Sequence, residues 1–418
     1  MTSQHLSKLI EESLAGLSPI QTIMKMAEDR NIQRLGLKPE EVISFGGGWC
    51  NHQAPEQLRQ IYQDIINDKD KFHASGRYSE IIGNYNCREQ LCRWEAALFQ
   101  MKHLHPDHVL LGQSATQLFH DILRVLSDPG EPVGYLDPTY ANYINAQKCA
   151  LPGSAMKFIP ALDPETWEYL SDPEHSLESL KHFTEQGLKT VVLPLADNPT
   201  SQLPDEAFVK SIREILEDVK GFLVFDIPYK TLWFDQMPSY FSWDPVDYPN
   251  LVTLNSNSKW LSSLGRRFGW VIANEHVIQG FEKLSESMIL SPDTLHSMAT
   301  AEYLKQGLKE KSLQQYVEDT RKLYQHTAQV FLKALDEHLG WPRLKPQGGL
   351  YTVCPTPEHQ DSIKFSETIL ATTGVLLIPG KGFGPSMEYG LRLSFGPLCY
   401  DHERIKEGFE RIGNYLSS

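Results

Sequence analysis

The chain has 418 residues, of which 41% are hydrophobic and 22% are charged, and its formal net charge at pH 7 is −14. A chain of this length and composition can bury a large core and is expected to form two or three domains. Its acidic surplus is spread along the sequence and argues against nucleic acid as a partner, because proteins that bind the phosphate backbone carry basic patches.

The N-terminal segment and the cysteines narrow the class of protein further. The segment MTSQHLSKLIEESLAG lacks the apolar core of a signal peptide, and no later run is apolar for long enough to span a bilayer. The six cysteines show neither paired metal-ligand spacing nor the density of a disulfide scaffold. We therefore expect a cytoplasmic protein with reduced thiols, no metal site and no membrane partner.

Residues 1–45 are polar and of helical character, and we expect them to form an arm that packs on a domain or on a second subunit. Beyond this arm, short apolar runs alternate with amphipathic stretches, which is typical of a parallel sheet covered by helices on both faces. The candidate strands are, in chain order, HVLLGQ, PVGYLD, AMKFIP, TVVLPLA, GFLVFD, LVTLNS and FGWVIA. Between the first two, SATQLFHDILRVLSDPG predicts a helix that starts at 114–116.

The pattern changes at about Lys309. A long helical segment is followed by the short strands LYTVC, VLLIPG and YGLRLSFG and by the closing helix DHERIKEGFERIGNYL. We therefore predict an α/β protein with an arm at 1–45, a large domain at 46–308 and a small domain at 309–418. The large domain is expected to hold a mostly parallel seven-stranded sheet flanked by helices. The small domain is expected to be α+β and to include the arm.

Polar residues that follow the strands are the candidates for a site, because ligands of an open parallel sheet bind beyond the carboxyl ends of its strands. Lys259 lies in LNSNSKWLSSLGRRFGW, behind two serines and ahead of Arg267. Alone, such a lysine is more often a solvated surface residue. The serine hydroxyls and the guanidinium would form an anion site beside an amine. An enzyme that uses pyridoxal phosphate needs this combination, since a lysine forms a Schiff base with the aldehyde while other groups hold the phosphate.

The same chemistry predicts partners for the cofactor's ring. Asp226 ends the run GFLVFD and would face the pyridine nitrogen, whereas Tyr229 and Asn198 would reach the phenolic oxygen. Each also has a simpler explanation, as a turn residue, a core tyrosine or an Asn-Pro turn. The start of the helix after the first strand would bind the phosphate through backbone amides and hydroxyls. Its residues are Ser114, Ala115 and Thr116.

From about residue 43 to its C-terminus the chain resembles the class I and II aminotransferases, which are pyridoxal-phosphate enzymes of fold type I. SNSKWLSSLGRRFGW is similar to the family's Ser-x-Ser-Lys with a glycine six residues and an arginine eight residues after the lysine. DNPTS resembles Asn-Pro-Thr-Gly, DIPY resembles Asp-x-x-Tyr, and YGLRLSFG resembles the segment whose arginine holds the substrate carboxylate. Ser201, Trp260 and Arg266 depart from the pattern, which bears on substrate and reaction outcome more than on cofactor binding.

The resemblance implies roles for individual residues. Lys259 would be the Schiff-base lysine and general base, Asp226 would pair with the pyridinium, and Tyr229 would hold the phenolic oxygen together with Asn198. Arg392 would bind the α-carboxylate of the substrate as a bidentate pair, with Arg266 the next candidate. Tyr140 is expected to stack on the ring, and the expected phosphate or cofactor contacts are Ser114, Ala115, Thr116, Ser256, Ser258 and Arg267.

Two further segments carry expectations from the resemblance. Tyr78 in GRYSEIIG resembles the tyrosine that reaches the phosphate of the neighbouring subunit, which implies a homodimer with shared active sites. ISFGGGW lies where the family's substrate loop falls, and its three glycines leave the match open among Gly46, Gly47 and Gly48. We expect Gly47, Gly48 and Asn198 to contact the substrate, together with Arg392.

These expectations point to an enzyme that acts on an L-amino acid. Loss of the α-proton to Lys259 is common to several outcomes of pyridoxal phosphate chemistry, and transfer of the amino group to a 2-oxo acid is our first choice. The alternative is a lyase or cyclase of the kind that closes a guanidino amino acid into a ring. A third hypothesis is an inactive relative that senses a ligand, but the basic helix-turn-helix segment typical of such regulators is absent from this sequence.

Overall fold

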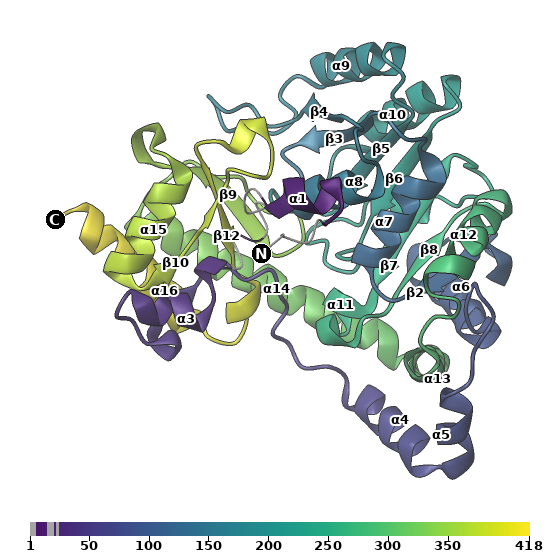
Figure 1. Ribbon diagram of the computed structural model, residues 1–418. Coiled ribbons are helices and arrows are strands. Elements are labelled where there is room, and N and C mark those ends of the chain that lie inside the picture. The colour runs from purple at the N-terminus through teal and green to yellow at the C-terminus, as the bar shows by residue number, and fades with distance from the viewer. Residues whose placement is uncertain (1–5, 15–20, 22–24) are drawn as a thin grey trace, which may run out of the picture.

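The computed structural model describes residues 6–14, 21 and 25–418. Its main feature is a seven-stranded sheet with the strand order β2-β8-β7-β6-β5-β3-β4 (Figure 1). Only β8 runs antiparallel to its two neighbours, so the sheet is mostly parallel, as predicted. All seven predicted strands are confirmed. Their bounds are β2 Val109–Gly112, β3 Val133–Asp137, β4 Met156–Pro160, β5 Thr190–Pro194, β6 Phe222–Asp226, β7 Leu251–Ser256 and β8 Gly269–Ile272.

Both faces of the seven-stranded sheet are covered by helices, which explains why most of its strands are rich in apolar residues and are buried along nearly their whole length. Every residue of β2, β3, β5, β7 and β8 is buried, whereas the edge strand β4 is mostly half-buried. On one face lie α7 (Ala115–Leu126), α8 (Asn142–Ala150) and α12 (Glu275–Met288). On the other lie α6 (Tyr85–Phe99), α9 (Pro173–Glu185), α10 (Glu206–Asp218) and α13 (Thr294–Glu310).

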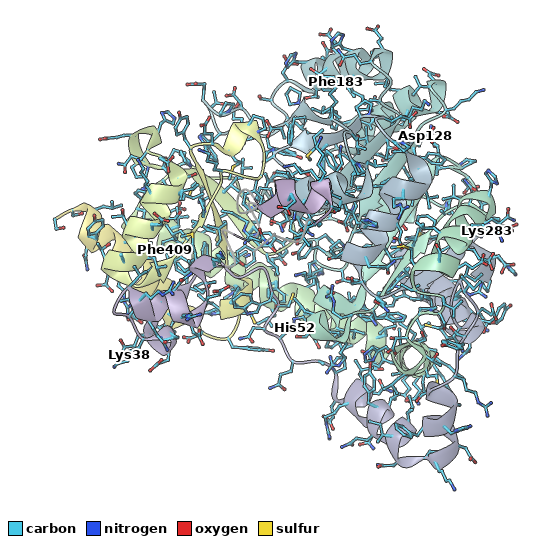
Figure 2. The ribbon with its side chains drawn as sticks, in the orientation of Figure 1. Lys38, His52, Asp128, Phe183, Lys283 and Phe409 are labelled. Carbon is cyan, nitrogen blue, oxygen red and sulfur yellow. The ribbon has the colours of Figure 1, made fainter. Side chains whose placement is uncertain are left out.

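A three-stranded antiparallel sheet with the order β11-β12-β9 forms the second core, to the left in Figure 1. Its strands are β9 Tyr351–Pro355, β11 Ile378–Pro379 and β12 Gly390–Ser394, and its helices are α14 Ser312–His338, α15 Ser362–Thr373 and α16 His402–Leu416. Phe45, Phe331 and Phe409 pack together in this core with ring centroids 4.7–5.0 Å apart. Figure 2 places Phe409 within this part of the molecule and Lys283 at the surface of the other.

The predicted strand VLLIPG is divided in the structure. Its first half, β10 (Val375–Leu376), pairs in parallel with β1 (Ile43–Ser44), whereas its second half pairs with β12. Leu377 between the two halves is fully buried. A single apolar run thus pairs with two different partners, which hydrophobicity alone does not reveal.

The described part of the arm contains α1 (Lys8–Leu14) and α3 (Asp29–Arg34). The segment after residue 25 contacts the three-stranded half of the molecule, where Met26 packs against Leu370 and Leu376. The rest of the predicted arm, residues 1–5, 15–20 and 22–24, lies outside the described residues. Helices α4 (Glu56–Asn67) and α5 (Lys69–Ser75) project from the opposite end of the molecule (Figure 1). Within the described ranges, none of the helices has the length and apolar character needed to cross a membrane.

Candidate active site

A cavity of about 760 Å³ lies where the carboxyl ends of the parallel strands meet the three-stranded sheet. It brings together most of the residues predicted from the sequence, although they come from distant segments of the chain. The predicted residues that line it are Gly46, Gly47, Gly48, Ala115, Thr116, Tyr140, Asn198, Asp226, Tyr229, Ser256, Ser258, Lys259, Arg267 and Arg392. Ser114, Tyr78 and the alternative carboxylate anchor Arg266 are not among the described residues that line it. Arg266 donates a hydrogen bond to Ser263 Oγ at 2.8 Å instead.

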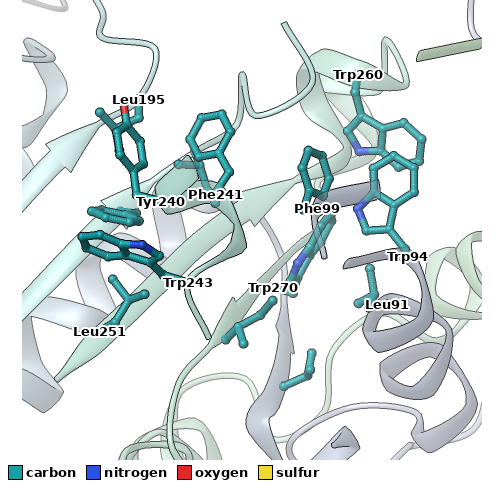
Figure 3. Packing of buried hydrophobic residues seen from close by; sticks show 14 of the residues in the cluster. Leu91, Trp94, Phe99, Leu195, Tyr240, Phe241, Trp243, Leu251, Trp260 and Trp270 are labelled. Carbon is teal, nitrogen blue, oxygen red and sulfur yellow. The ribbon is translucent and has the colours of Figure 1, made fainter. Parts of the chain in front are cut away.

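Lys259 is held at the cavity by the short helix α11 (Asn257–Trp260), which begins directly after β7. Ser256 caps this helix by accepting a hydrogen bond from the backbone N–H of Ser258 at 3.3 Å. Trp260 points into the core and stacks on Trp94 with centroids 4.5 Å apart (Figure 3). This packing gives a structural reason for a tryptophan after the lysine, since it anchors the helix on the side opposite the cavity.

The amine of Lys259 faces two other lining residues. It donates a hydrogen bond to the carbonyl oxygen of Gly48 and lies 5.4 Å from the centre of the Tyr229 ring. An amine so placed can form a covalent bond with an aldehyde in the cavity or exchange a proton with a ligand there.

Asp226 is a buried carboxylate at the end of β6. Its Oδ2 atom accepts a hydrogen bond from Tyr143 at 2.5 Å, whereas its Oδ1 atom is buried and has no partner among the described residues. Burial raises the pKa of Asp226 to about 6, although the Tyr143 hydrogen bond and the charge of Lys259 act in the opposite direction. A buried acceptor without a partner costs free energy. A protonated ring nitrogen in the cavity would remove that cost.

The N-terminus of α7 opens toward the cavity, as expected for an anion site. Ser114 caps the helix by accepting a hydrogen bond from the backbone N–H of Gln117 at 3.3 Å. Strand β8 passes so close that a Cβ atom at Gly269 would lie 3.0 Å from the backbone nitrogen of Ala115. The glycine therefore permits this approach of strand and helix. Arg267 is exposed, and its Nη1 donates to the carbonyl oxygen of Leu264 at 2.6 Å.

Arg392 lies on β12, at the opposite wall of the cavity, and its side chain is buried. Its Nη1 donates to Oδ1 of Asn198 at 3.0 Å and its Nη2 donates to the carbonyl oxygen of Gly46 at 2.7 Å. The guanidinium carbon lies 4.6 Å from the ring centre of Tyr351 and 5.2 Å from that of Phe383. Its Nε atom has no partner among the described residues. A buried cation at a cavity wall is suited to a carboxylate ligand.

The three consecutive glycines make different contacts, which the sequence left open. The carbonyl oxygen of Gly46 accepts from Arg392, that of Gly47 from Ser394 at 2.6 Å, and that of Gly48 from Lys259. A Cβ atom at Gly47 would lie 2.5 Å from the Trp49 ring. The loop thus passes between the lysine and the arginine with no room for a side chain at its centre.

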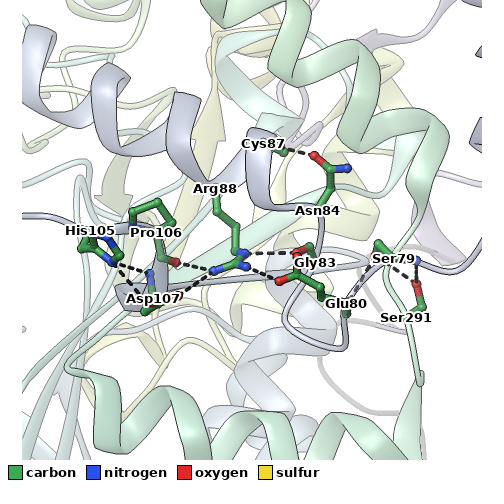
Figure 4. A network of polar contacts seen from close by, with 10 residues as sticks. All are labelled: Ser79, Glu80, Gly83, Asn84, Cys87, Arg88, His105, Pro106, Asp107 and Ser291. Atoms are coloured by element: carbon green, nitrogen blue, oxygen red, sulfur yellow. Dashed lines mark hydrogen bonds and ion pairs between the residues drawn. The ribbon is translucent and has the colours of Figure 1, made fainter.

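Tyr78 lies outside the cavity and is 82% exposed. The loop that carries it is firmly anchored (Figure 4). The backbone N–H of Ser79 donates to Ser291 at 3.0 Å, and the buried guanidinium of Arg88 forms an ion pair with Glu80. Arg88 also donates to the carbonyl oxygens of Gly83 at 3.0 Å and Pro106 at 2.8 Å. An exposed tyrosine on an anchored loop is suited to contact a second molecule.

Several lining residues escaped the sequence analysis. Tyr143 lies in α8, and its ring packs edge to face against that of Tyr140, which precedes the helix, with centroids 5.4 Å apart. The second tyrosine of the run YANY was the available signal in the sequence. Tyr351 and Ile378 lie on β9 and β11 and reach the cavity only through the pairing of the small sheet. Trp49 lies in a loop without a periodic pattern. The arm residues Ala27 and Glu28 also line the cavity.

Comparisons with known proteins agree with this geometry. The family model for aminotransferases of class I and II matches residues 40–412. An aspartate aminotransferase of Pyrococcus horikoshii is 25% identical over 94% of this chain and 95% of its own length. Aromatic-amino-acid aminotransferase 1 of Thermococcus litoralis is 27% identical over 94% and 92%, respectively. A solved structure of a mutant aspartate aminotransferase from Thermus thermophilus shares the fold with a TM-score of 0.84, at 20% identity over 99% of this chain and 100% of that one. Because the family model spans most of the sequence, this chain belongs to the class I and II aminotransferases.

Proposed function

We propose that this protein uses pyridoxal phosphate to transfer the amino group of an L-amino acid to a 2-oxo acid. The observation that carries the proposal is the meeting of Lys259, Asp226 and Arg392 in one cavity, each in a setting that suits its role. The relatives described above are named for amino-group transfer, and no feature of the described residues favours the lyase or cyclase alternative. An inactive relative that only senses a ligand would not need Lys259, Asp226 and Arg392 together.

The residues at the cavity fit the cofactor. The unpartnered Oδ1 atom of Asp226 would accept a hydrogen bond from the pyridinium nitrogen, while Ala115 and Thr116 at the α7 N-terminus, with Ser256 and Arg267, would bind the phosphate. Further contacts are expected from Ser114, Tyr140, Asn198, Tyr229 and Ser258. When bound, pyridoxal phosphate withdraws electrons from the substrate's α-carbon and carries the amino group between the two substrates.

The chain's own groups would perform the proton transfer and orient the substrate. The Nζ atom of Lys259 would take the proton from the α-carbon and later return it. Arg392 would hold the α-carboxylate, and its buried contacts with Asn198 and Gly46 fix the direction of its remaining N–H donors. Gly47 and Gly48 would border the substrate because they lie between the lysine and the arginine.

We also propose that two copies of the chain form a dimer in which Tyr78 reaches the phosphate site of the other copy. Large apolar side chains are exposed on the same loop and on neighbouring segments, which supports a covered face. They are Ile66, Phe72, Tyr78, Tyr85, Met288 and Leu290. The domain boundaries at 45/46 and 308/309 and the cytoplasmic location stay predictions.

The test is a half-reaction. The purified protein is loaded with pyridoxal phosphate and mixed with single L-amino acids while the cofactor absorbance is followed. We expect at least one amino acid to convert the cofactor to its pyridoxamine form with release of the 2-oxo acid. The Lys259→Ala variant should bind the cofactor but fail to convert it, whereas a Lys283→Ala variant at an exposed site should behave as the native protein. Product formation without the pyridoxamine form would refute amino-group transfer.

A further inference from the structure

Ser201 is a fully buried residue in an unusual backbone conformation, three residues after Asn198. Its φ angle is +56°, in the left-handed region that residues other than glycine rarely adopt. At this position the family motif Asn-Pro-Thr-Gly has a glycine, for which this conformation has no steric cost. A serine here therefore needs a compensating interaction.

The hydroxyl of Ser201 provides such an interaction. Its Oγ atom accepts a hydrogen bond from the backbone N–H of Tyr351 at 2.9 Å, while its carbonyl oxygen accepts from the backbone N–H of Gln347 at 2.9 Å. The segment before β9 comes so close to Ser201 that a Cβ atom at Gly349 would lie 2.9 Å from Oγ of the serine. Ser201 thus joins the loop after β5 of the large sheet to the start of β9 in the small sheet.

Tyr351, the residue held by Ser201, contacts both ends of the proposed active site. Its Oη atom lies 2.6 Å from Oη of Tyr229. Its ring faces the guanidinium of Arg392 at 4.6 Å, a cation–π distance. Both tyrosines are buried, so neither hydroxyl exchanges its partner freely with water. A displacement of Tyr351 would therefore disturb both Tyr229, the candidate cofactor contact, and Arg392, the candidate carboxylate anchor.

We propose that Ser201 is a positioning residue that fixes Tyr351 so that its ring supports Arg392 and its hydroxyl orients Tyr229. This inference rests on the proposed function. A glycine at position 201 would adopt the backbone conformation without strain, but it would leave the buried N–H of Tyr351 without an acceptor. The serine thus accepts a strained backbone conformation but forms a hydrogen bond that links the segments of the two sheets.

The test compares four variants with the native protein. Ser201→Gly relieves the backbone and removes the hydroxyl, whereas Ser201→Ala removes the hydroxyl alone. Tyr351→Phe removes the contact with Tyr229 but keeps the ring beneath Arg392. The matched control is Ser176→Ala, which deletes a buried serine hydroxyl that donates to the carbonyl oxygen of Pro160 at 2.6 Å, away from the cavity. Each protein is examined for thermal stability, for its affinity for a competing monocarboxylate and for the pH at which the bound cofactor changes absorbance.

Both Ser201 variants should weaken monocarboxylate binding several-fold and raise the pH of the absorbance change, because a misplaced Tyr351 supports neither Arg392 nor Tyr229. Tyr351→Phe should raise that pH with a smaller effect on the carboxylate. Ser176→Ala should lower thermal stability only. If the Ser201 variants behave like Ser176→Ala, the inference is wrong while the proposed function stands. If the native protein binds no pyridoxal phosphate, both fail, and this result is seen before any variant is made.

Discussion

Replacement of Asp226 by asparagine should stabilise the cofactor-free protein while abolishing turnover. The carboxylate is buried with one oxygen unpartnered, and its pKa is raised to about 6 from the ordinary value of 3.8. A pKa difference of one unit corresponds to about 1.4 kcal/mol, so the ionised carboxylate costs the folded, cofactor-free protein about 3 kcal/mol. Asparagine has the same shape, can still accept the Tyr143 hydrogen bond and carries no charge.

The sign follows from the direction of the pKa change. Between pH 4 and pH 6 the folded protein binds more protons at Asp226 than the unfolded chain does, so stability falls as the pH rises through this window. Above pH 6, the ionised carboxylate of Asp226 destabilises the folded protein by the full amount of about 3 kcal/mol. With an unfolding entropy of about 2.1 cal/mol/K per residue, 3 kcal/mol corresponds to about 3 °C for a chain of 418 residues.

The assay is thermal unfolding of the cofactor-free native and Asp226→Asn proteins from pH 4.5 to pH 8. We expect the variant to unfold about 3 °C higher at pH 8 and the difference to shrink toward pH 4.5. Burial also raises the pKa values of Asp137 to about 6 and Asp197 to about 7, but both residues are present in the two proteins and cancel in the difference. Asp64→Asn, at an exposed site, is the control. A variant no more stable than the native protein at pH 8, or one that kept its turnover, would refute the reasoning.

Three other predictions use the same structure. Borohydride reduction should fix the cofactor on Lys259, and peptide mapping that placed it on another lysine would contradict the assignment. Arg392→Lys should lower kcat/KM for amino acids through loss of a bidentate pair, by an amount that corresponds to about 2–3 kcal/mol of binding free energy. It should affect amines without a carboxylate much less. Equal losses for both kinds of substrate would mean that Arg392 has a structural role only. Lys230→Met should destabilise the protein by about 3–5 kcal/mol, because it leaves the buried carboxylate of Glu95 unpaired. Thermal unfolding should show recovery in a Lys230→Met/Glu95→Gln double variant, and no recovery would mean that the pair is not the cause.

The sequence by itself determined the seven strands, because strands covered on both faces must be mostly apolar and are therefore visible as runs such as TVVLPLA. It also determined where chemistry occurs on these strands. Asp226 and Lys259 each lie at or just after the carboxyl end of a strand, and in a parallel sheet these ends converge. Their positions relative to the strands were thus enough to predict that Asp226 and Lys259 lie close together. The assignment of cofactor roles to them depended on the resemblance of their motifs to those of a known family.

The tertiary structure decided what depends on contacts between distant segments. Only strand pairing shows that VLLIPG divides between two sheets, and only packing brings Arg392 onto Asn198 from 194 residues away. Tyr351 carries no local signal because its neighbours at the cavity come from other strands and loops. Ser201 stood out in the sequence merely as a departure from a motif, and its hydrogen bond to Tyr351 became visible only in the fold. The physical reason is that hydrophobic periodicity reports which face of an element is buried, whereas side-chain partners are fixed by how separate elements meet.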